Sequence, residues 1–375
     1  MDTFTKTSLD GDDLITIPLK FLWYAHLHPS LSSARSTVHN TFTITLTCLV
    51  IALAVKGIQN TYNEDIFFAA ECLQTCLLTV HVIGKILIMR VQRNAIRELV
   101  SKKSVFWRPE DFTEETQKEY LIVIMRVRKI MRYYYTLALT TVLLYDLQPV
   151  LAGTLPIACY VPPFSFKYLV VVVWYLSFVT CVTICGIDSF FCSLAACIWL
   201  QFKLLHSKIK ENDIYIEQSQ KKAWTEVKES VDHHVFLLGY CESLNTTFQG
   251  MFLIQFLLAV LNGALGMFIF MQPGVWSNRL KCFAYFVRTI SESAFYCLPA
   301  EFLANSANEV GDVVYESKWY NINKEQIKKC YTLLMMKSQK SLIFSAYGLI
   351  WINLRTLVVI YKTIFSYFTY LNSTK

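Results

Sequence analysis

The feature that most constrains the fold is one long apolar run. It extends from Tyr168 to Phe202, 35 residues in which Asp188 is the only charged side chain. As a helix this run would be about 52 Å long, whereas the hydrocarbon core of a bilayer is about 30 Å thick. The chain as a whole is 54% hydrophobic and 17% charged, against about 25% charged in soluble domains. These properties predict a membrane protein whose longest apolar run is two short spans or one projecting helix.

Six further segments are apolar enough to cross a membrane. They are residues 38–55, 66–89, 133–155, 251–271, 282–300 and 342–371. Lys and Arg accumulate on the cytoplasmic side of short loops, so their positions decide how the long run is counted. With seven spans and a cytoplasmic N-terminus, 26 of the 35 basic residues are cytoplasmic and five are outside; splitting the run reduces this contrast to 17 against 14. We therefore predict an all-α protein of seven transmembrane helices, with a cytoplasmic N-terminus and an extracellular C-terminus.

The predicted spans divide a single domain, residues 1–375, into functional parts. Residues 1–37 form a cytoplasmic segment, for which we expect no secretory signal because acidic residues replace a basic leader. Residues 38–304 hold the first six helices, and residues 342–375 form the last helix. Two further cytoplasmic segments are residues 203–249, between the fourth and fifth spans, and residues 305–341, between the sixth and the last. After the break at Arg108-Pro109, we expect Asp111 to cap the helix that leads into the third span.

The sequence offers few candidates for the convergent set of acids, bases or ligands that catalysis requires. It has no phosphate-binding Walker loop, no Gly-x-Ser-x-Gly elbow and no His-Glu-x-x-His zinc motif. The His233-His234 doublet is interpreted as part of a solvated helix face rather than a metal site, and the twelve cysteines as reduced packing residues. We predict neither an enzyme nor a bound metal or cofactor.

Charged residues inside predicted spans are costly and are therefore candidates for functional roles. We expect Lys85, Arg288 and Glu292 to neutralise one another or to reach the membrane interface. In the last span, polar residues follow a spacing of 7, 4, 3 and 4, which places them on one helical stripe: Arg355, Lys362, Ser366, Thr369 and Ser373. This pattern is compatible with a packed helix that makes interhelical hydrogen bonds and, equally, with the lining of a pore.

The C-terminal third contains a group of distinctive motifs: the runs 315–320 (YESKWY) and 333–340 (LLMMKSQK), Ala346-Tyr347-Gly348, and Tyr361-Lys362-Thr363. In these residues it resembles the insect odorant receptors. Ser341 stands where that family usually has proline. Gustatory receptors share the architecture, but their closing motif, Thr-Tyr, five residues and then Gln-Phe, is missing after Thr369-Tyr370.

The resemblance implies a function. A second cytoplasmic loop of about 47 residues (203–249) is shorter than in the family's coreceptor, so the chain resembles an odorant-tuned subunit. It would form a heterotetramer with the coreceptor, a nonselective cation channel gated by a small volatile without a G protein. The location implied is the plasma membrane of a sensory dendrite, with lipid and no nucleic acid as a partner. A gustatory-type receptor channel and a multi-span transporter, the latter faintly suggested by Gly263 and Gly266, are the alternatives.

The resemblance also assigns regions to roles. The last helix would line the pore, with Tyr370 and Thr374 near the gate and Ser366 and Ser373 added by the polar stripe. The cytoplasmic anchor between subunits would include Trp319, Tyr331, Leu334 and Met335. An odorant pocket in the outer half of spans two to six would draw on apolar and aromatic side chains with a few polar ones: Phe68, Cys72, Leu73, Leu144, Tyr145, Gln148, Tyr175, Phe178, Val182, Ser291 and Phe295.

Overall fold

The computed structural model describes residues 12–31, 33–218, 220–271, 276–317, 319–321 and 325–373, most of which are helical. The elements in chain order are α2 (Asp12–Tyr24), α3 (Ser33–Thr61), α4 (Ile66–Val91), α5 (Arg93–Lys102), η1 (Lys103–Val105), η2 (Pro109–Asp111), α6 (Glu114–Asp146), α7 (Gln148–Leu151), α8 (Phe166–Gln218), α9 (Gln220–Phe270), α10 (Trp276–Glu316), η3 (Trp319–Asn321), α11 (Glu325–Ser338), β1 (Ser345–Ala346), β2 (Ile350–Trp351) and α12 (Leu354–Ser373).

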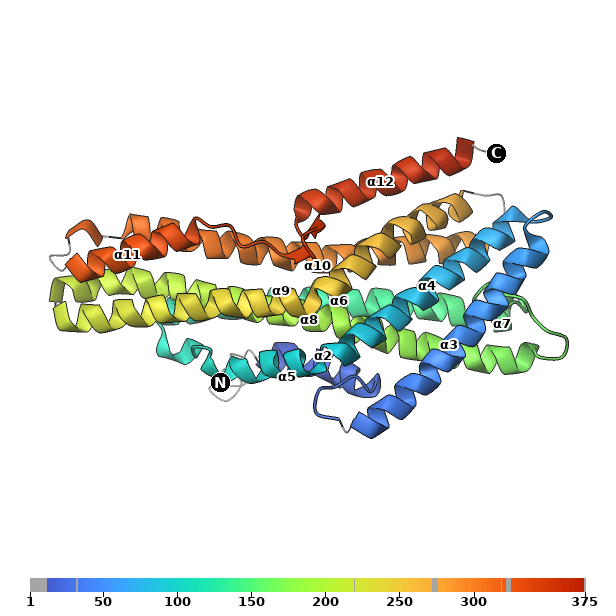
Figure 1. Cartoon of the computed structure of the whole chain (residues 1–375), viewed down its shortest axis with the longest axis horizontal. Helices are drawn as coiled ribbons and strands as arrows, with labels where there is room; N and C mark the ends of the chain where they lie inside the picture. The colour runs from blue at the N-terminus through green and yellow to red at the C-terminus, as the bar shows by residue number, and fades with distance from the viewer. Residues whose placement is uncertain are drawn as a thin grey trace.

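The helices form an elongated bundle. In Figure 1, α8, α9 and α10 run along its length, α11 lies beside them at one end, and α3 and α4 join them toward the other. By length and composition, four helices of the described chain are able to cross a membrane, within the ranges 34–61, 66–91, 166–211 and 223–270. Helices α6, α10 and α12 supply the other three predicted spans.

Helix α8 is the continuous helix that the charge distribution predicts, 53 residues long. Residues 182–198 are all buried, as expected for a predominantly apolar stretch. Helix α2 lies against this stretch, where the missing side chain of Gly186 admits Phe21 and Leu22. The amphipathic N-terminal helix therefore packs on the bundle as part of its core.

Three predicted local features are corrected by the structure. The helix after Arg108-Pro109 is capped by Thr113, whose hydroxyl accepts a hydrogen bond from the Thr116 amide, and not by Asp111. The third span ends at Asp146 and not at residue 155, because Pro149 interrupts the backbone hydrogen bonds of a continuing helix. The last helix begins at Leu354, twelve residues later than predicted.

A small hairpin occupies the first part of the predicted last span. Strands β1 and β2 pair antiparallel, and Tyr347 and Gly348 both have positive φ in the turn between them. Glycine tolerates this conformation without strain. The hairpin is fixed to α9 because the Asn245 side chain accepts a hydrogen bond of 2.8 Å from the Ser345 amide. Part of the family-like motif Ala346-Tyr347-Gly348 therefore encodes a turn.

The interpretation of His233-His234 as a solvated face is wrong. Both side chains are buried. The ring of His233 stacks on Trp107 with centroids 3.8 Å apart, and Gln201 bonds both the amide and the carbonyl of Trp107. The doublet packs the loop before α6 against α9, a contact between distant segments that helical charge periodicity does not reveal.

A buried ion pair joins the helices at the centre of the bundle. Lys85 Nζ lies 2.7 Å from Asp188 Oδ1, and both side chains are 0% exposed. The hydroxyl of Tyr134 donates to Asp188 Oδ2 at 2.6 Å, and that of Tyr296 donates to Oδ1. Helices α4, α6, α8 and α10 thus meet at one carboxylate. Lys85 pairs with Asp188, whereas the sequence suggested Arg288 and Glu292 as its neighbours.

We expect Asp188→Asn to destabilise the protein strongly, because it leaves the Lys85 ammonium buried without a counter-charge. Breaking one side of a buried pair costs about 3 to 5 kcal/mol. The double variant Lys85→Gln/Asp188→Asn removes both charges, keeps an acceptor for the tyrosines and should recover much of the melting temperature of the detergent-purified protein.

The matched control is the exposed pair of Glu98 and Lys102, also 2.7 Å apart, with side chains 63% and 37% exposed. Glu98→Gln should leave the melting temperature almost unchanged, because exposed pairs contribute little. If Asp188→Asn melts like Glu98→Gln, the central pair does not hold the bundle.

Candidate ligand-binding site

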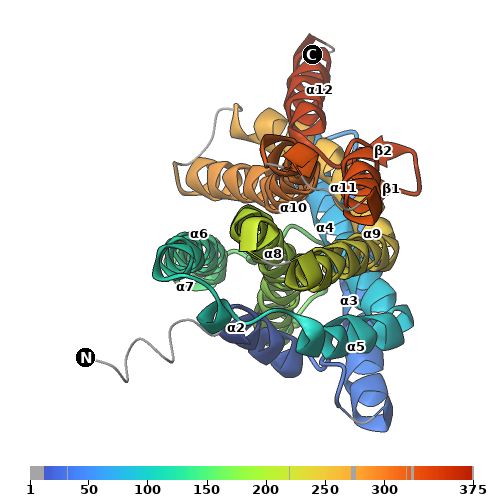
Figure 2. The same cartoon turned by 90° about the vertical axis from the view of Figure 1, so that its left-hand side faces the viewer.

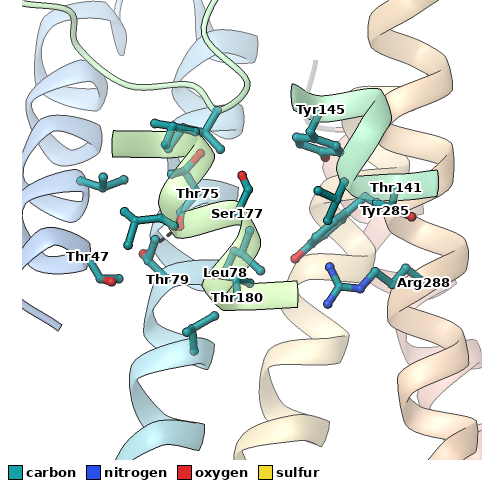
Figure 3. A pocket seen from close by; sticks show the side chains of 16 residues that line it. Thr47, Thr75, Leu78, Thr79, Thr141, Tyr145, Ser177, Thr180, Tyr285 and Arg288 are labelled. Carbon is teal, nitrogen blue, oxygen red and sulfur yellow. Dashed lines mark hydrogen bonds between the residues drawn. The ribbon is translucent and has the colours of Figure 1, made fainter. Parts of the chain in front are cut away.

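A cavity of about 70 Å³ lies among five helices, α3, α4, α6, α8 and α10. Its walls combine aliphatic side chains with hydroxyl groups, and one charged residue closes it on the α10 side (Figure 3). The lining residues are Thr47, Val50, Thr75, Leu78, Thr79, Val82, Thr141, Val142, Tyr145, Ile157, Val173, Leu176, Ser177, Thr180, Tyr285 and Arg288.

The threonines make this cavity less polar than its composition suggests. The hydroxyls of Thr47, Thr79 and Thr141 each donate to a backbone carbonyl one turn earlier in their own helix, at 2.7 to 2.8 Å. Thr75 does the same at 3.1 Å. Such back-bonding is a common way to satisfy a hydroxyl inside a membrane helix. The donor hydrogens of these four hydroxyls are therefore used within the helices.

Two tyrosines lie at one end of the cavity. The rings of Tyr145 on α6 and Tyr285 on α10 have centroids 6.4 Å apart and are inclined by 55°. Both rings also line a second void of about 20 Å³ that reaches Glu71 and Pro156. The same two rings therefore border both spaces.

The α10 wall carries Arg288, whose side chain is 5% exposed. Its guanidinium points into the cavity toward Leu78 and Thr180 (Figure 3). Glu292, one turn along α10, places Oε1 2.9 Å from Arg288 Nη2. This confirms the expected pairing of these two residues.

The comparisons with known proteins identify the family. The family model described as 7tm Odorant receptor matches residues 66–365, most of the chain. The chain belongs to the odorant receptor family. It is a member of a receptor family and not of an enzyme family.

Individual odorant receptors are similar at low identity. Odorant receptor 42b of Drosophila melanogaster is 18% identical over 380 residues, covering 98% of this chain and 94% of that protein. Putative odorant receptor 83c of the same fly is 24% identical over 178 residues, and Odorant receptor 22c is 20% identical over 166. These two shorter matches span 44% and 40% of the relatives' length.

Solved structures share the fold across the whole receptor. The insect olfactory receptor OR5 from Machilis hrabei in complex with eugenol superposes with a TM-score of 0.82 at 13% identity, covering 97% of this chain and 98% of that one. Another structure of OR5 gives 0.77 at 14% identity, covering 92% and 91%. The seven-helix membrane fold predicted from the sequence is thereby confirmed, while the side on which each terminus lies stays a prediction.

Of the eleven residues predicted for the odorant pocket, Tyr145 lines this cavity. Cys72, Gln148 and Val182 are buried elsewhere in the receptor, and Leu73 and Phe178 are exposed on its surface. Phe295 stacks on Tyr134, Tyr175 bonds His39, and Ser291 donates to its own helix. Phe68 packs on the cluster around Ala54, and Leu144 is half-buried beside Tyr145. Their contact with an odorant stays a prediction.

The missed lining residues share a recognisable pattern. On α8 they are Val173, Leu176, Ser177 and Thr180, spaced by 3, 1 and 3, which is one face of a helix. The prediction chose the larger neighbours Tyr175 and Phe178. Small hydroxyl residues on an otherwise apolar helix were the available signal, because a cavity needs side chains that leave room.

The predicted gate and anchor residues are placed as follows. Ser366, Tyr370 and Ser373 are exposed on α12, and Thr374 lies outside the described residues. In α11, Tyr331 and Leu334 are buried within the receptor's own core and Met335 is half-buried, as is Trp319 in η3. Their roles between subunits stay predictions.

Filling the cavity should weaken the response to an odorant. Val142 lines the cavity, whereas the next residue, Leu143, is 50% exposed on the other side of α6. We expect Val142→Phe to raise the half-maximal odorant concentration at least about tenfold, equivalent to about 1.4 kcal/mol of lost binding. Leu143→Phe adds a ring at the neighbouring position and should leave the dose-response curve unchanged at equal surface expression. Equal effects of the two variants would place the odorant elsewhere.

Proposed function

We propose that this odorant receptor is the tuned subunit of a ligand-gated, nonselective cation channel, assembled with a coreceptor as a heterotetramer in the plasma membrane of sensory dendrites. A small volatile binds in the cavity between the five helices. It favours the open state because it binds that state more tightly. The observation that carries the proposal is the direction in which α12 presents its polar stripe.

Helix α12 contacts the rest of the receptor through an apolar row. The row consists of Leu357, Ile360, Ile364 and Phe368, all buried. The stripe identified in the sequence, Arg355, Lys362, Ser366, Thr369 and Ser373, is exposed. At 100° per residue the two rows lie on opposite sides of the helix. Figure 2 shows α12 at the margin of the molecule, with its free side turned away from the other helices.

A polar surface on a membrane helix must face protein or water. Within the described receptor, the stripe points away from the chain's own helices, which favours a pore lining over hydrogen bonding within the subunit. Copies arranged about an axis would place these stripes around a shared aqueous path. The exposed polar stripe of α12 thus accounts both for the need for several subunits and for the position of the pore.

Helix α10 connects the cavity to α12. It carries Tyr285 and Arg288 in the cavity wall and, farther along, Glu301, whose Oε2 accepts a hydrogen bond of 3.3 Å from the amide of Leu354, the first residue of α12. Pro299 lies between these contacts and interrupts the helical hydrogen bonds there. An odorant that displaces α10 therefore acts directly on the start of the pore helix.

The proposal is tested by recording membrane current in cells that express the receptor with and without a coreceptor. We expect volatiles to evoke a cation current only when both chains are present, and blockers of G-protein signalling to leave it unchanged. A current that requires a G protein, or surface-expressed receptor that conducts with no coreceptor and no volatile, would contradict the proposal.

Packing of α12 gives a second test. A side chain on Gly263 would meet Ile364 Cδ1 at 2.7 Å and Cγ2 at 3.3 Å, so this glycine lets α12 approach α9 closely. Because α9 is continuous through Gly263 and Gly266, the glycines serve packing and the hint of a transporter's broken helix disappears. Gly263→Ala should reduce the odorant-evoked current severalfold by displacing the pore helix.

The companion variants identify the cause. Ile364→Val in the Gly263→Ala background shortens the opposing side chain and should restore current. Gly239→Ala is the control, because nothing lies within 4 Å of an added Cβ there. Equal currents in Gly263→Ala and Gly239→Ala would show that the α9–α12 contact is unimportant for conduction.

A further inference from the structure

The guanidinium of Arg288 is the one charged group among the described residues that line the cavity. The Arg288 side chain is 5% exposed, and its Nη2 lies 2.9 Å from Glu292 Oε1, but its Nε hydrogen has no hydrogen-bond partner within the described chain. A guanidinium carries five N–H donors in a planar fork. Burying such a donor without an acceptor is costly, and the guanidinium that carries it points into the space that a ligand would occupy (Figure 3).

The charges around Arg288 are already balanced. Glu292 neutralises it at 2.9 Å, and Gln255 Nε2 donates to the other oxygen of Glu292 at 3.3 Å. The neighbouring pair of Lys85 and Asp188 is also neutral. A carboxylate guest would add an uncompensated negative charge in an apolar region. A neutral oxygen acceptor would satisfy the free Nε hydrogen without that cost.

Four of the hydroxyl groups in the wall do not compete with Arg288 as donors. The donor hydrogens of Thr47, Thr75, Thr79 and Thr141 are bonded to carbonyls of their own helices. Arg288 is the charged donor among the polar groups of the described wall. The remaining wall is largely aliphatic, as at Leu78, Val82, Val142 and Leu176, and would contact the hydrocarbon part of a guest through apolar burial.

We propose that the ligand of this cavity is a neutral volatile with a carbonyl oxygen, such as a ketone, aldehyde or ester, and that Arg288 selects it by donating a hydrogen bond to that oxygen. This inference rests on the proposed odorant-gated function and names the chemical class that the cavity accepts. Arg288 is thereby a specificity-determining residue of the receptor.

Water is the rival partner of Arg288. A void of about 10 Å³ is lined by His81, Gln255 and Asn262 as well as Arg288, and it is large enough for about one water molecule. If a water there satisfies the guanidinium, the ligand need not carry an acceptor. If the ligand supplies the acceptor, the receptor should prefer a carbonyl ligand to an alkene of the same shape. If water supplies it, the two ligands should be about equally potent.

The experiment compares carbonyl volatiles with alkenes of the same shape on the receptor expressed with its coreceptor. The probes are a panel of ketones, aldehydes and esters, each paired with the alkene in which the carbonyl oxygen is replaced by a methylene group. Acetophenone with α-methylstyrene and cyclohexanone with methylenecyclohexane are two such pairs. We expect activation by the carbonyl member at about tenfold or more lower concentration, the usual effect of one hydrogen bond to a charged donor. Benzoate should be weaker than acetophenone.

The variant Arg288→Lys keeps a positive charge beside Glu292 but removes the Nε hydrogen and the planar fork. We expect the carbonyl preference to fall severalfold while responses to the alkenes change little. Arg132→Lys, an exposed site on α6, controls for the exchange of arginine for lysine. The ligand ranking in the unaltered receptor needs no variant, so the test remains decisive if Arg288→Lys does not reach the surface.

The outcomes separate the two proposals. Alkenes as potent as their carbonyl partners, a preference unchanged by Arg288→Lys, or benzoate stronger than acetophenone would overturn the role of Arg288 while leaving an odorant-gated channel in place. Surface-expressed receptor that responds to no volatile of any class with the coreceptor present would overturn the proposed function, and the ligand class with it.

Discussion

The carboxylate of Asp188 is the interaction on which the arrangement of the bundle depends. It accepts from Lys85, Tyr134 and Tyr296, so that α4, α6 and α10 are all bonded to the middle of α8. In an apolar environment such groups have no alternative partners, and any sliding or rotation of one helix would leave a charge or hydroxyl unpaired. The pair therefore determines the relative positions of four helices, which hydrophobic contact alone leaves adjustable. The same interaction determines where α10 places its part of the cavity wall. Tyr296, which bonds Asp188, and Arg288, which lines the cavity, lie on this helix about 12 Å apart.

The features that were predictable from the sequence are those determined within single segments or by the membrane. The length of α8 followed from an apolar run and from the distribution of Lys and Arg. The start of α4 at Ile66 was correct, and Asp65 explains it by accepting hydrogen bonds from two amides of the first turn. The Arg288 and Glu292 pair was accessible because its members are four residues apart on one helix.

Features that depend on how distant segments meet were not predictable. Nothing in the spacing of His233 and His234 shows that Trp107 stacks against this part of α9. Lys85 and Asp188 are separated by 103 residues, and the choice of partner depends on the rotation of two helices about their axes. The same rotation separates Ser177, which lines the cavity, from the exposed Phe178 beside it. Neighbouring residues on a helix point about 100° apart. This difference is enough to place one side chain in the cavity wall and the next on the outer surface.

The back-bonded threonines of the cavity have a consequence for how receptors of this kind change during evolution. Threonine and valine have nearly the same shape, and the carbonyl that accepts from such a threonine belongs to the same helix. Exchanging one residue for the other therefore adds or removes a hydroxyl and its bond within the helix and leaves the volume of the side chain nearly unchanged. A wall containing Thr47, Thr75, Thr79 and Thr141 beside Val50, Val82 and Val142 can therefore vary in polarity at constant volume. Single substitutions of this kind change the polarity of the cavity while keeping its shape.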